Sequence, residues 1–345
     1  MRCVLPLASV AQIMAASAVD DRMSWLVCEV TRARFARLNG TLARAVDCAE
    51  PWLADIGRHL IDAGGKQLRP ALLMVSAGFG SGALDEEALQ QAAAAIELLH
   101  IATLYHDDVM DRSPLRRGVP TLNARYGDAT AVTAGTFLLA RATILLAGLG
   151  DELAQWLARG ALSLALGQLL ETENAYNTEH QVDAYLRIAA RKTAALFELP
   201  CRVGALLSCA SDEVTQALAV YGRALGMAFQ AADDALDISA TTGRLGKMTG
   251  TDLREGVYGL PVLLALSQGG VVAAELREIL ERDEPDETDA ARACRLLQDS
   301  GAVPAALRIA QDYSRRAAEA AYQLPPGAPR SSLMYLTRYA VSRTS

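Results

Sequence analysis

Apolar residues recur every three to four positions through almost all of the chain after residue 23, which is the period of an amphipathic α-helix. Alanine and leucine dominate, whereas aromatic residues make up only 5% of the sequence. Strands favour β-branched and aromatic residues, so the composition agrees with the period. The sequence therefore predicts an all-α fold in which helices pack on helices.

The predicted helices are separated by Gly, Pro and Asp residues of the kind that mark helix ends. They cover residues 24–47, 51–63, 69–80, 85–112, 128–149, 151–175, 181–210, 212–239, 259–267, 271–281, 288–299, 303–322 and 330–341. The breaks are short and polar, and none has the composition of an interdomain linker. We therefore expect a weakly patterned leader over residues 1–23 and a single helical domain over residues 24–345.

Charge and cysteine content exclude several classes of protein. The net charge is −7 and no run of five or more Lys or Arg occurs, so no nucleic-acid partner is expected. The six cysteines lack CxxC spacing and are expected to be reduced thiols. Two uncharged stretches, 3–19 and 256–274, are interrupted by Pro6, by Pro261 and by Gly269 and Gly270, so no transmembrane segment is predicted.

Two aspartate clusters recur in the chain, DDVMD at 107–111 and DDALD at 233–237. Asp107 and Asp111 are one helical turn apart, so their Cβ atoms lie on one face, about 5–6 Å apart. Such carboxylates repel unless a cation intervenes, and oxygen ligands suit Mg²⁺, which prefers to share its shell with phosphate oxygens. A single cluster of this kind is often a solvated helix end. The second copy, with Asp233 and Asp237 in the same helical phase, favours metal ions held between two facing helices.

Basic residues occur in short groups beside glycine or a helix break, where side chains and backbone amides can approach phosphate oxygens together. These groups are GGKQLRP at 64–70, Arg116-Arg117-Gly118, Arg191-Lys192-Thr193 and Gly246-Lys247. Each group alone is weak support for a site. His100 precedes Asp107 by two helical turns on roughly the same face, and Gln230 lies about one turn before the second cluster. Both are expected to line the same cavity.

Taken together and in this order, the motifs resemble those of the trans-prenyltransferase, or polyprenyl diphosphate synthase, family. The resemblance spans roughly residues 52–265 and includes GGKQLRP, ELLHIATLYHDDVMD followed by LRRGVPTLNARYG, RKTAALF, and AFQAADDALD followed by GKMTGTDLREG. It implies an antiparallel helical bundle of the class I isoprenoid synthase type around a deep cavity, and a homodimer. It also implies a Mg²⁺-dependent head-to-tail condensation of isopentenyl diphosphate with an allylic diphosphate.

The resemblance assigns roles to particular residues. Asp107, Asp108 and Asp111 would bind Mg²⁺ from one side and Asp233, Asp234 and Asp237 from the other, around three ions. Arg116, Lys192 and Lys247 would hold the allylic diphosphate, and Lys66, Arg69, His100 and Arg117 would hold isopentenyl diphosphate. Thr193 and Gln230 would lie beside the developing carbocation, and the released diphosphate would take the final proton.

Four further positions bear on activity and product length. The family usually has Asp where this chain has Thr136, and often Lys where it has Val257. Ala102 and Thr103, five and four positions before Asp107, are small where similar short-chain enzymes carry bulky aromatics. That comparison implies an open tunnel and a medium-to-long product of about six to nine isoprene units.

Three alternative functions remain at this point. A geranylgeranyl diphosphate synthase would stop at four units. A class I terpene cyclase would ionise a prenyl diphosphate without an isopentenyl site, whereas Lys66, Arg69 and Arg117 favour the transferase. A non-catalytic partner subunit of a two-component synthase would generally lack the aspartates, and all six are present. Because both substrates are intracellular diphosphates, the assigned reaction implies a cytoplasmic location, with peripheral membrane contact left open.

Overall fold

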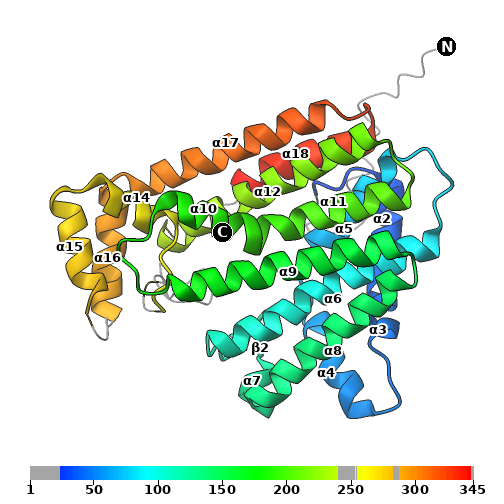
Figure 1. The fold of residues 1–345 in the computed structure, drawn as a ribbon, viewed down its shortest axis with the longest axis horizontal. Coiled ribbons are helices and arrows are strands. Elements are labelled where there is room, and N and C mark those ends of the chain that lie inside the picture. The colour runs from blue at the N-terminus through cyan, green and yellow to red at the C-terminus, as the bar shows by residue number, and fades with distance from the viewer. Residues whose placement is uncertain (1–23, 240–252, 254, 283–286, 343–345) are drawn as a thin grey trace.

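The computed structural model describes residues 24–239, 253, 255–282 and 287–342, so the leader and Lys247 lie outside the described residues. These residues are almost entirely helical, as Figure 1 shows, and the all-α prediction is confirmed. The helices are α2 (Glu29–Ala36), α3 (Leu38–Ala45), α4 (Pro51–Asp62), α5 (Leu68–Ser76), α6 (Glu86–Met110), α7 (Leu122–Tyr126), α8 (Asp128–Ala147), α9 (Asp151–Glu173), α10 (Val182–Ala189), α11 (Ala195–Leu207), α12 (Asp212–Ser239), α14 (Leu260–Gln268), α15 (Gly270–Leu280), α16 (Glu287–Asp299), α17 (Ala302–Tyr322) and α18 (Ala328–Ser342).

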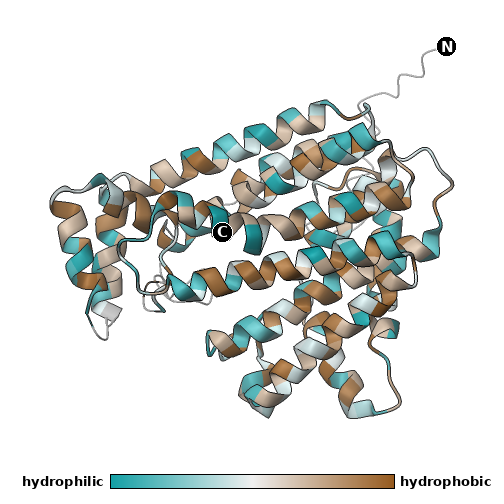
Figure 2. Ribbon diagram, viewed as in Figure 1, coloured by the Kyte–Doolittle hydropathy of each residue, from teal (hydrophilic) through white to brown (hydrophobic). Residues whose placement is uncertain are grey.

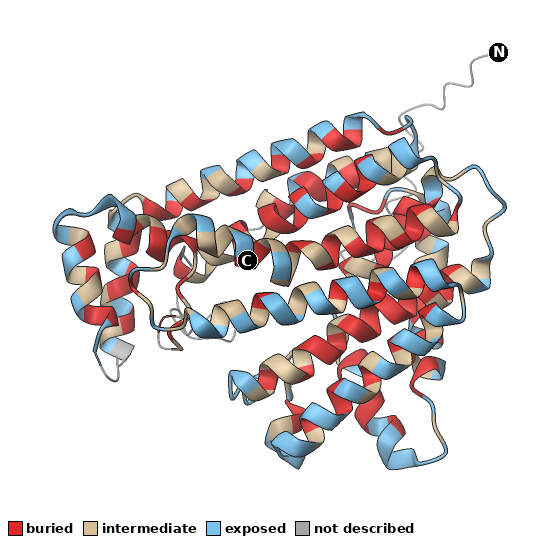
Figure 3. Cartoon of the chain, viewed as in Figure 1, coloured by how far each residue is buried: buried red, intermediate tan, exposed pale blue. Residues whose placement is uncertain are grey.

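Long helices lie side by side over most of the molecule (Figure 1). The most extensive contacts join α12 to α17 and to α11, and α6 to α8. Figure 3 shows buried residues concentrated on the helix faces that meet one another, as expected when an apolar stripe of each helix packs against its neighbours. Hydropathy follows the same stripes in Figure 2.

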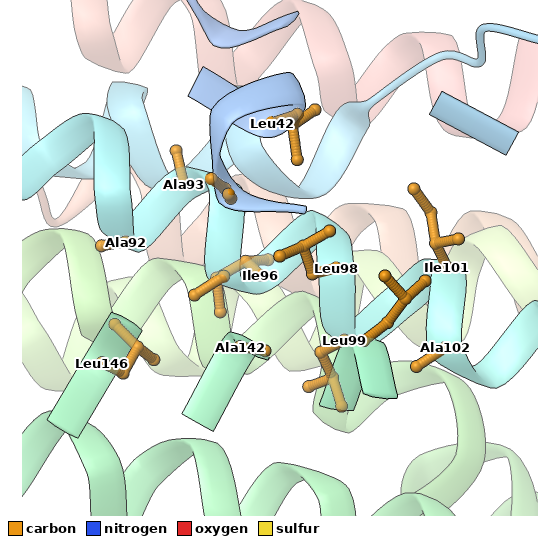
Figure 4. Packing of buried hydrophobic residues seen from close by; sticks show 14 of the residues in the cluster. Leu42, Ala92, Ala93, Ile96, Leu98, Leu99, Ile101, Ala102, Ala142 and Leu146 are labelled. Carbon is orange, nitrogen blue, oxygen red and sulfur yellow. The ribbon is translucent and has the colours of Figure 1, made fainter. Parts of the chain in front are cut away.

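Small residues let α6 approach its neighbours closely. Ala92, Ala93, Ala94 and Ala95 are fully buried. Ala92 and Ala93 belong to one core cluster with Leu42 of α3 and with Ala142 and Leu146 of α8, all of which Figure 4 labels. Alanine also has the highest helix propensity. The alanine run therefore favours the helix and its close packing together.

The N-terminus of α6 is capped, and its C-terminus carries the first aspartate cluster. Asp85 accepts hydrogen bonds from the backbone N–H of Glu87 at 2.8 Å and of Ala88 at 3.2 Å, a standard N-cap arrangement. The helix ends at Met110. The second cluster occupies the last two turns of α12 in the same way. Both clusters therefore lie at the ends of helices where the macrodipole is negative.

Besides the short helix α7, which falls in a predicted break, the structure differs from the predicted helices at three places. Residues 24–47 form two shorter helices that meet at Arg37. A hairpin of β1 (Leu115–Arg116) and β2 (Val119–Pro120) follows α6, and its two turn residues, Arg117 and Gly118, have φ of 54° and 79°. Positive φ at both turn positions is typical of two-residue hairpins. The third difference is a π-helix at Ala190–Ala194 between α10 and α11.

Two findings bear on the membrane predictions. The stretch 256–274 is broken between α14 and α15 by Gly269 and Gly270, at φ of 69° and 78°. Within the described residues, α8 is long and apolar enough to cross a membrane by length and composition, and 33% of its apolar window is buried. Core helices of soluble proteins can have the same length and apolar composition, so α8 is weak evidence for a membrane span.

The cysteines that the structure describes are all free thiols, in agreement with the predicted reduced state. They are Cys28, Cys48, Cys201, Cys209 and Cys294.

Candidate active site

The first aspartate cluster, at the end of α6, holds carboxylates in different environments. Asp107 is half-buried and Asp111 is exposed. Burial raises the pKa of Asp107 to about 6; Lys192 opposes this shift and Asp111 adds to it. A partly buried acid next to a second acid is poorly stabilised in its charged form. A cation between the two would lower that cost.

The middle aspartate of each cluster is hydrogen-bonded within the protein. Asp108 is 1% exposed, and its Oδ1 accepts from Nε of Arg116 at 2.7 Å. Asp234 accepts from the Tyr185 hydroxyl at 2.5 Å, from the Leu260 backbone N–H at 2.7 Å and from Nε2 of Gln230 at 2.8 Å. These two carboxylates therefore also hold their surroundings in place.

A pair of charges on α9 and the π-helix lies between the two clusters. Glu171 of α9 forms an ion pair with Lys192. Burial opposes the charged form of Lys192, but Glu171 and then Asp107 outweigh it, so the pKa of Lys192 is raised. Glu171 also acts on the pKa of Tyr185, the residue bonded to Asp234. Glu171 and Lys192 therefore lie near Asp107 of the first aspartate cluster and near Tyr185, which is bonded to Asp234 of the second cluster.

The π-helix carries Lys192 and Thr193 and is held by two close backbone approaches. A Cβ added at Gly167 of α9 would lie 2.7 Å from the backbone N of Lys192, and one added at Gly226 of α12 would lie 2.6 Å from Cα of Ala194. Single-turn π segments inside helices are frequent at functional sites. Here the segment turns the Thr193 hydroxyl toward Gln230, to whose Oε1 it donates at 2.7 Å.

Each of the basic residues assigned to isopentenyl diphosphate makes a contact within the fold. Nη1 of Arg117 donates to the Leu60 carbonyl at 2.7 Å, and its Nη2 lies 3.7 Å from Oε1 of Glu97. The guanidinium of Arg69 lies 4.9 Å from the centroid of the Phe197 ring, and Nζ of Lys66 lies 5.9 Å from that of Tyr339.

His100 belongs to the same group. Burial, followed by the charges of Arg69 and Arg117, lowers the pKa of His100 well below its usual value. Its imidazole is therefore neutral at neutral pH and can donate one hydrogen bond. Its buried Nδ1 has no hydrogen-bond partner.

The remaining predicted residues have less direct relations to this site. Thr136 is exposed on α8 and donates to the Val132 carbonyl of its own helix at 3.0 Å. Val257 is partly exposed before α14. Ala102 and Thr103 are both buried, but Ala102 packs in the cluster that joins α6 to α8, whereas Thr103 lies nearer the face of Asp107.

Three site residues were not recognised in the sequence: Glu97, Glu171 and Tyr185. Glu97 is the single acid within residues 88–106, and this could have marked it. Tyr185 precedes Lys192 by seven positions, two turns of a regular helix, but the π-helix intervenes. Glu171 shows no distinguishing signal in the sequence.

Two further observations concern ligands. Among residues 24–239, 253, 255–282 and 287–342, no group of three or more His, Cys, Asp or Glu side chains is gathered closely enough to hold a metal ion. A cavity of about 660 Å³ lies between α3, α6 and α8, away from the aspartates. None of the predicted site residues lines it. It is lined by Ala36, Arg37, Gly40, Thr41, Arg44, Ala45, Glu87, Gln90, Gln91, Arg141 and Leu145.

The helical bundle, its two aspartate clusters and the cations beside them define a prenyl-transferring enzyme. The chain belongs to the polyprenyl synthetase family, whose model matches residues 50–297. The resemblance found in the sequence is thereby confirmed.

Curated relatives agree with this assignment. The chain is 38% identical over 312 residues to the nonaprenyl diphosphate synthase of Mycobacterium tuberculosis, covering 90% of this chain and 93% of the relative. It is 32% identical over 303 residues to the heptaprenyl diphosphate synthase component 2 of Bacillus subtilis, covering 88% and 86%.

Among solved structures, the chain is similar to a polyprenyl synthase from Caulobacter crescentus complexed with calcium and isoprenyl diphosphate. The TM-score is 0.88 with 37% identity, over 94% of this chain and 98% of the other. A decaprenyl diphosphate synthase from Rhodobacter capsulatus gives a TM-score of 0.86 with 32% identity, over 92% and 98%.

Proposed function

We propose that this enzyme condenses isopentenyl diphosphate with an allylic diphosphate and repeats the step to a product of about six to nine isoprene units. The observation that carries the proposal is that two sets of cations lie near the aspartate clusters: Lys192 paired with Glu171 and Arg116 paired with Asp108 on one hand, and Arg117 paired with the buried Glu97 on the other. One group suits an allylic diphosphate and the other a second diphosphate. The similarity to nonaprenyl and heptaprenyl diphosphate synthases supports the length.

Mg²⁺ fits the acids at the ends of α6 and α12. Carboxylates at the negative end of a helix dipole are destabilised in the absence of a cation, and the raised pKa of Asp107 reflects its burial and the nearby Asp111. We propose that Asp107, Asp111, Asp233 and Asp237 bind the metal directly, together with diphosphate oxygens. Asp108 and Asp234, also predicted as ligands, would orient Arg116 and Gln230. The resemblance implies three ions.

Ionisation of the allylic substrate builds negative charge on the leaving diphosphate. Bound Mg²⁺ would neutralise part of that charge. Lys192 adds a fixed cation on the same side, and preorganised charges of this kind lower the barrier because they need no rearrangement. Arg116, oriented by Asp108 through its Nε and Nη2, would donate its remaining N–H groups to the diphosphate. The predicted contribution of Lys247 lies outside the described residues.

The carbocation and the second substrate would meet beside the π-helix. The Thr193 hydroxyl donates a hydrogen bond to Oε1 of Gln230. Its oxygen lone pairs would therefore face the positive carbon. On the other side, Lys66, Arg69 and Arg117 would bind the diphosphate of isopentenyl diphosphate, and neutral His100 would donate to it. Buried apolar residues such as Ile96 and Leu99 exclude water that would quench the cation. The released diphosphate takes the final proton.

Turnover by the purified chain tests this proposal. With Mg²⁺, farnesyl diphosphate and isopentenyl diphosphate together, diphosphate release and products of thirty or more carbons are expected. Release without isopentenyl diphosphate would indicate a cyclase instead, and products that stop at twenty carbons would indicate a geranylgeranyl diphosphate synthase. If diphosphate is released only after a second protein is added, the chain is a non-catalytic subunit. This outcome is tested because one relative is named as a component of a synthase.

We also propose a homodimer that buries an apolar face of α8 and α9. Its exposed residues include Val132, Ile144, Leu162, Leu166 and Leu169, of which Ile144, Leu162 and Leu169 are at least 60% exposed. Several exposed large apolar residues on two neighbouring helices are typical of an interface between subunits. Light scattering at twice the monomer mass is expected, and a monomer would contradict the proposal.

The domain and the location are further parts of the proposal. α11 contributes to the core clusters on both of its sides, through Leu199 on one and Phe197 on the other, which supports a single domain over residues 24–345. Limited proteolysis should therefore yield one stable core. A cytoplasmic location, with peripheral membrane contact during release of an apolar product, would be checked by cell fractionation.

A further inference from the structure

One buried carboxylate lies among the cations proposed to bind isopentenyl diphosphate. Glu97 on α6 is 1% exposed, and its Oε1 lies 3.7 Å from Nη2 of Arg117. That distance is an ion-pair distance but is longer than a hydrogen bond. Neither carboxylate oxygen has a hydrogen-bond partner. Glu97 precedes His100 by three residues, so both side chains lie on neighbouring parts of one helix face.

Two guanidinium groups act on this carboxylate. Burial raises the pKa of Glu97, while Arg117 and Arg69 oppose the shift. Burial likewise lowers the pKa of Arg69 to about 10, and Glu97 is the largest opposing influence. Arginine stays protonated in proteins, so both guanidinium groups are cationic at neutral pH. Burying a charge is costly unless a partner of opposite sign is close by, so the three groups depend on one another.

Each arginine has few other anchors. A Cβ at Gly65 would lie 2.7 Å from Cζ of Arg117, so the absence of a side chain at Gly65 leaves room for that guanidinium. Arg117 also donates a hydrogen bond to the Leu60 carbonyl. Arg69 lies against the ring of Phe197, and its buried Nε has no hydrogen-bond partner. A ring face fixes the distance of a guanidinium but leaves its rotation free. Glu97 supplies the charge that can orient it.

We propose that Glu97 is a positioning residue for the homoallylic substrate: it holds Arg69 and Arg117 from behind, so that their outward N–H groups meet the diphosphate of isopentenyl diphosphate. This inference rests on the proposed function of that site. A bidentate guanidinium–phosphate contact requires a defined orientation of the plane. Glu97 itself touches no substrate. Its effect is therefore on substrate binding and not on the chemical step.

Steady-state kinetics of Glu97→Gln test the inference. Wild-type enzyme is assayed first, and its failure to consume isopentenyl diphosphate would reject the proposed function before any variant is made. For Glu97→Gln, KM for isopentenyl diphosphate is expected to rise about tenfold or more, since the negative charge that orients the two buried guanidinium groups is lost. KM for the allylic substrate and kcat at saturation should change by no more than about twofold.

Glu198→Gln is a matched control. Glu198 also pairs with two arginines, its Oε1 lying 2.7 Å from Nε of Arg202 and its Oε2 lying 3.5 Å from Nη1 of Arg223, but these residues line a separate pocket beside Trp156. Its variant should keep both KM values. A buried ion pair that only supports the fold would lower the melting temperature in both variants and shift no KM selectively.

Glu97→Asp serves if the glutamine variant does not fold. It keeps the charge but withdraws the carboxylate by one methylene, so KM for isopentenyl diphosphate is expected to rise about threefold or more with the melting temperature nearly preserved. A wild-type KM for isopentenyl diphosphate in a folded Glu97→Gln or Glu97→Asp enzyme would overturn the inference. So would equal increases in both KM values.

Discussion

The hydroxyl of Tyr185 donates a hydrogen bond of 2.5 Å to Oδ2 of Asp234 and so joins α10 to the second aspartate cluster. The same oxygen accepts the backbone N–H of Leu260 at the start of α14. A Cβ at Gly259 would lie 2.9 Å from it, so only glycine leaves room for this approach. Three helices thus meet at one carboxylate oxygen.

Tyr185→Phe should therefore weaken catalysis without removing a proposed metal ligand. Loss of a hydrogen bond to a charged group costs about 1.5–3 kcal/mol, and Asp234 would hold Gln230 less firmly. We expect kcat to fall about tenfold with little change in KM for isopentenyl diphosphate. Tyr258→Phe is the control, because that buried tyrosine donates to the Leu280 carbonyl at 3.2 Å, outside the site. Equal kcat in the two variants would contradict the prediction.

Asp107→Ala should lower turnover by orders of magnitude while leaving helix content unchanged, because it removes a proposed ligand and little packing. Asp299→Ala provides the comparison, since Asp299 is an exposed carboxylate at the C-terminal end of another helix, α16. Circular dichroism and diphosphate release would be measured for both. Wild-type activity of the Asp107 variant would remove this residue from the site.

Metal binding should stabilise the protein more at pH 7.5 than at pH 5. The pKa values of Asp107 and Asp234 are both raised to about 6, in each case chiefly by burial. Between their ordinary value near 4 and about 6, the folded metal-free protein binds more protons than the unfolded chain, so its stability falls as pH rises. Above pH 6 both acids are charged, and Asp107, the proposed ligand of the two, can bind Mg²⁺. Protons would compete with the metal below that pH.

Thermal unfolding with EDTA and with Mg²⁺ across this range measures the effect. The difference in melting temperature between the two conditions should grow from pH 5 to pH 7.5, with its midpoint near 6. In Asp107→Ala the difference should shrink at every pH. A difference that is independent of pH in the wild type would show that Asp107 does not bind the ion.

The sequence predicted the helices and the two aspartate clusters well because both depend on local pattern. Apolar periodicity and helix-ending residues are short-range signals, and the pair Asp107–Asp111 is defined by one helical turn. The π-helix at 190–194 was missed, since one extra residue in a turn barely disturbs the apolar period. The tight turn at Arg117 and Gly118 was seen only as a basic group beside glycine.

The supporting residues of the site could not be found in the same way. Glu171 and Tyr185 are ordinary helical residues, and their roles arise from contacts across the fold with Lys192 and Asp234. Glu97 stands in an apolar run, but its arginine partners come from other parts of the chain. Their recognition requires knowing which helices are neighbours, and neighbourhood is set by the packing of the whole core.

Gly167→Ala should disturb the π-helix. The new methyl group would lie 2.7 Å from the backbone N of Lys192, which is closer than packed atoms allow, so α9 and the π-helix must separate. Overpacking of this kind costs about 1–3 kcal/mol, and Lys192 would be displaced from its place. We expect a lower melting temperature and a kcat reduced about tenfold or more. Gly148→Ala, whose methyl group would meet no atom nearer than 3.5 Å, should leave both unchanged.

Thr103 on α6 is expected to influence the length of the product. Thr103 precedes Asp107 by four residues, so it lies on nearly the same face of α6 and about 6 Å deeper along its axis. Thr103→Phe is therefore expected to shorten the product by blocking the path that we propose for the growing chain below the metal site. The Thr103 hydroxyl donates a hydrogen bond to the His100 carbonyl of its own helix, and it makes no other hydrogen bond among the described residues, so the substitution breaks no hydrogen bond to another helix.

Ala102→Phe is expected to behave differently. The Ala102 carbonyl lies 3.0 Å from the position of a Cβ at Gly135, so α8 packs tightly at this level of α6. A phenylalanine there would shorten the product but would also lower the melting temperature, because overpacking costs about 1–3 kcal/mol of folding free energy. Chromatography of the products with thermal unfolding separates the two variants, and Thr103→Ser should make wild-type products. Unchanged products from a stable Thr103→Phe enzyme would mean that the growing chain does not pass along this face of α6.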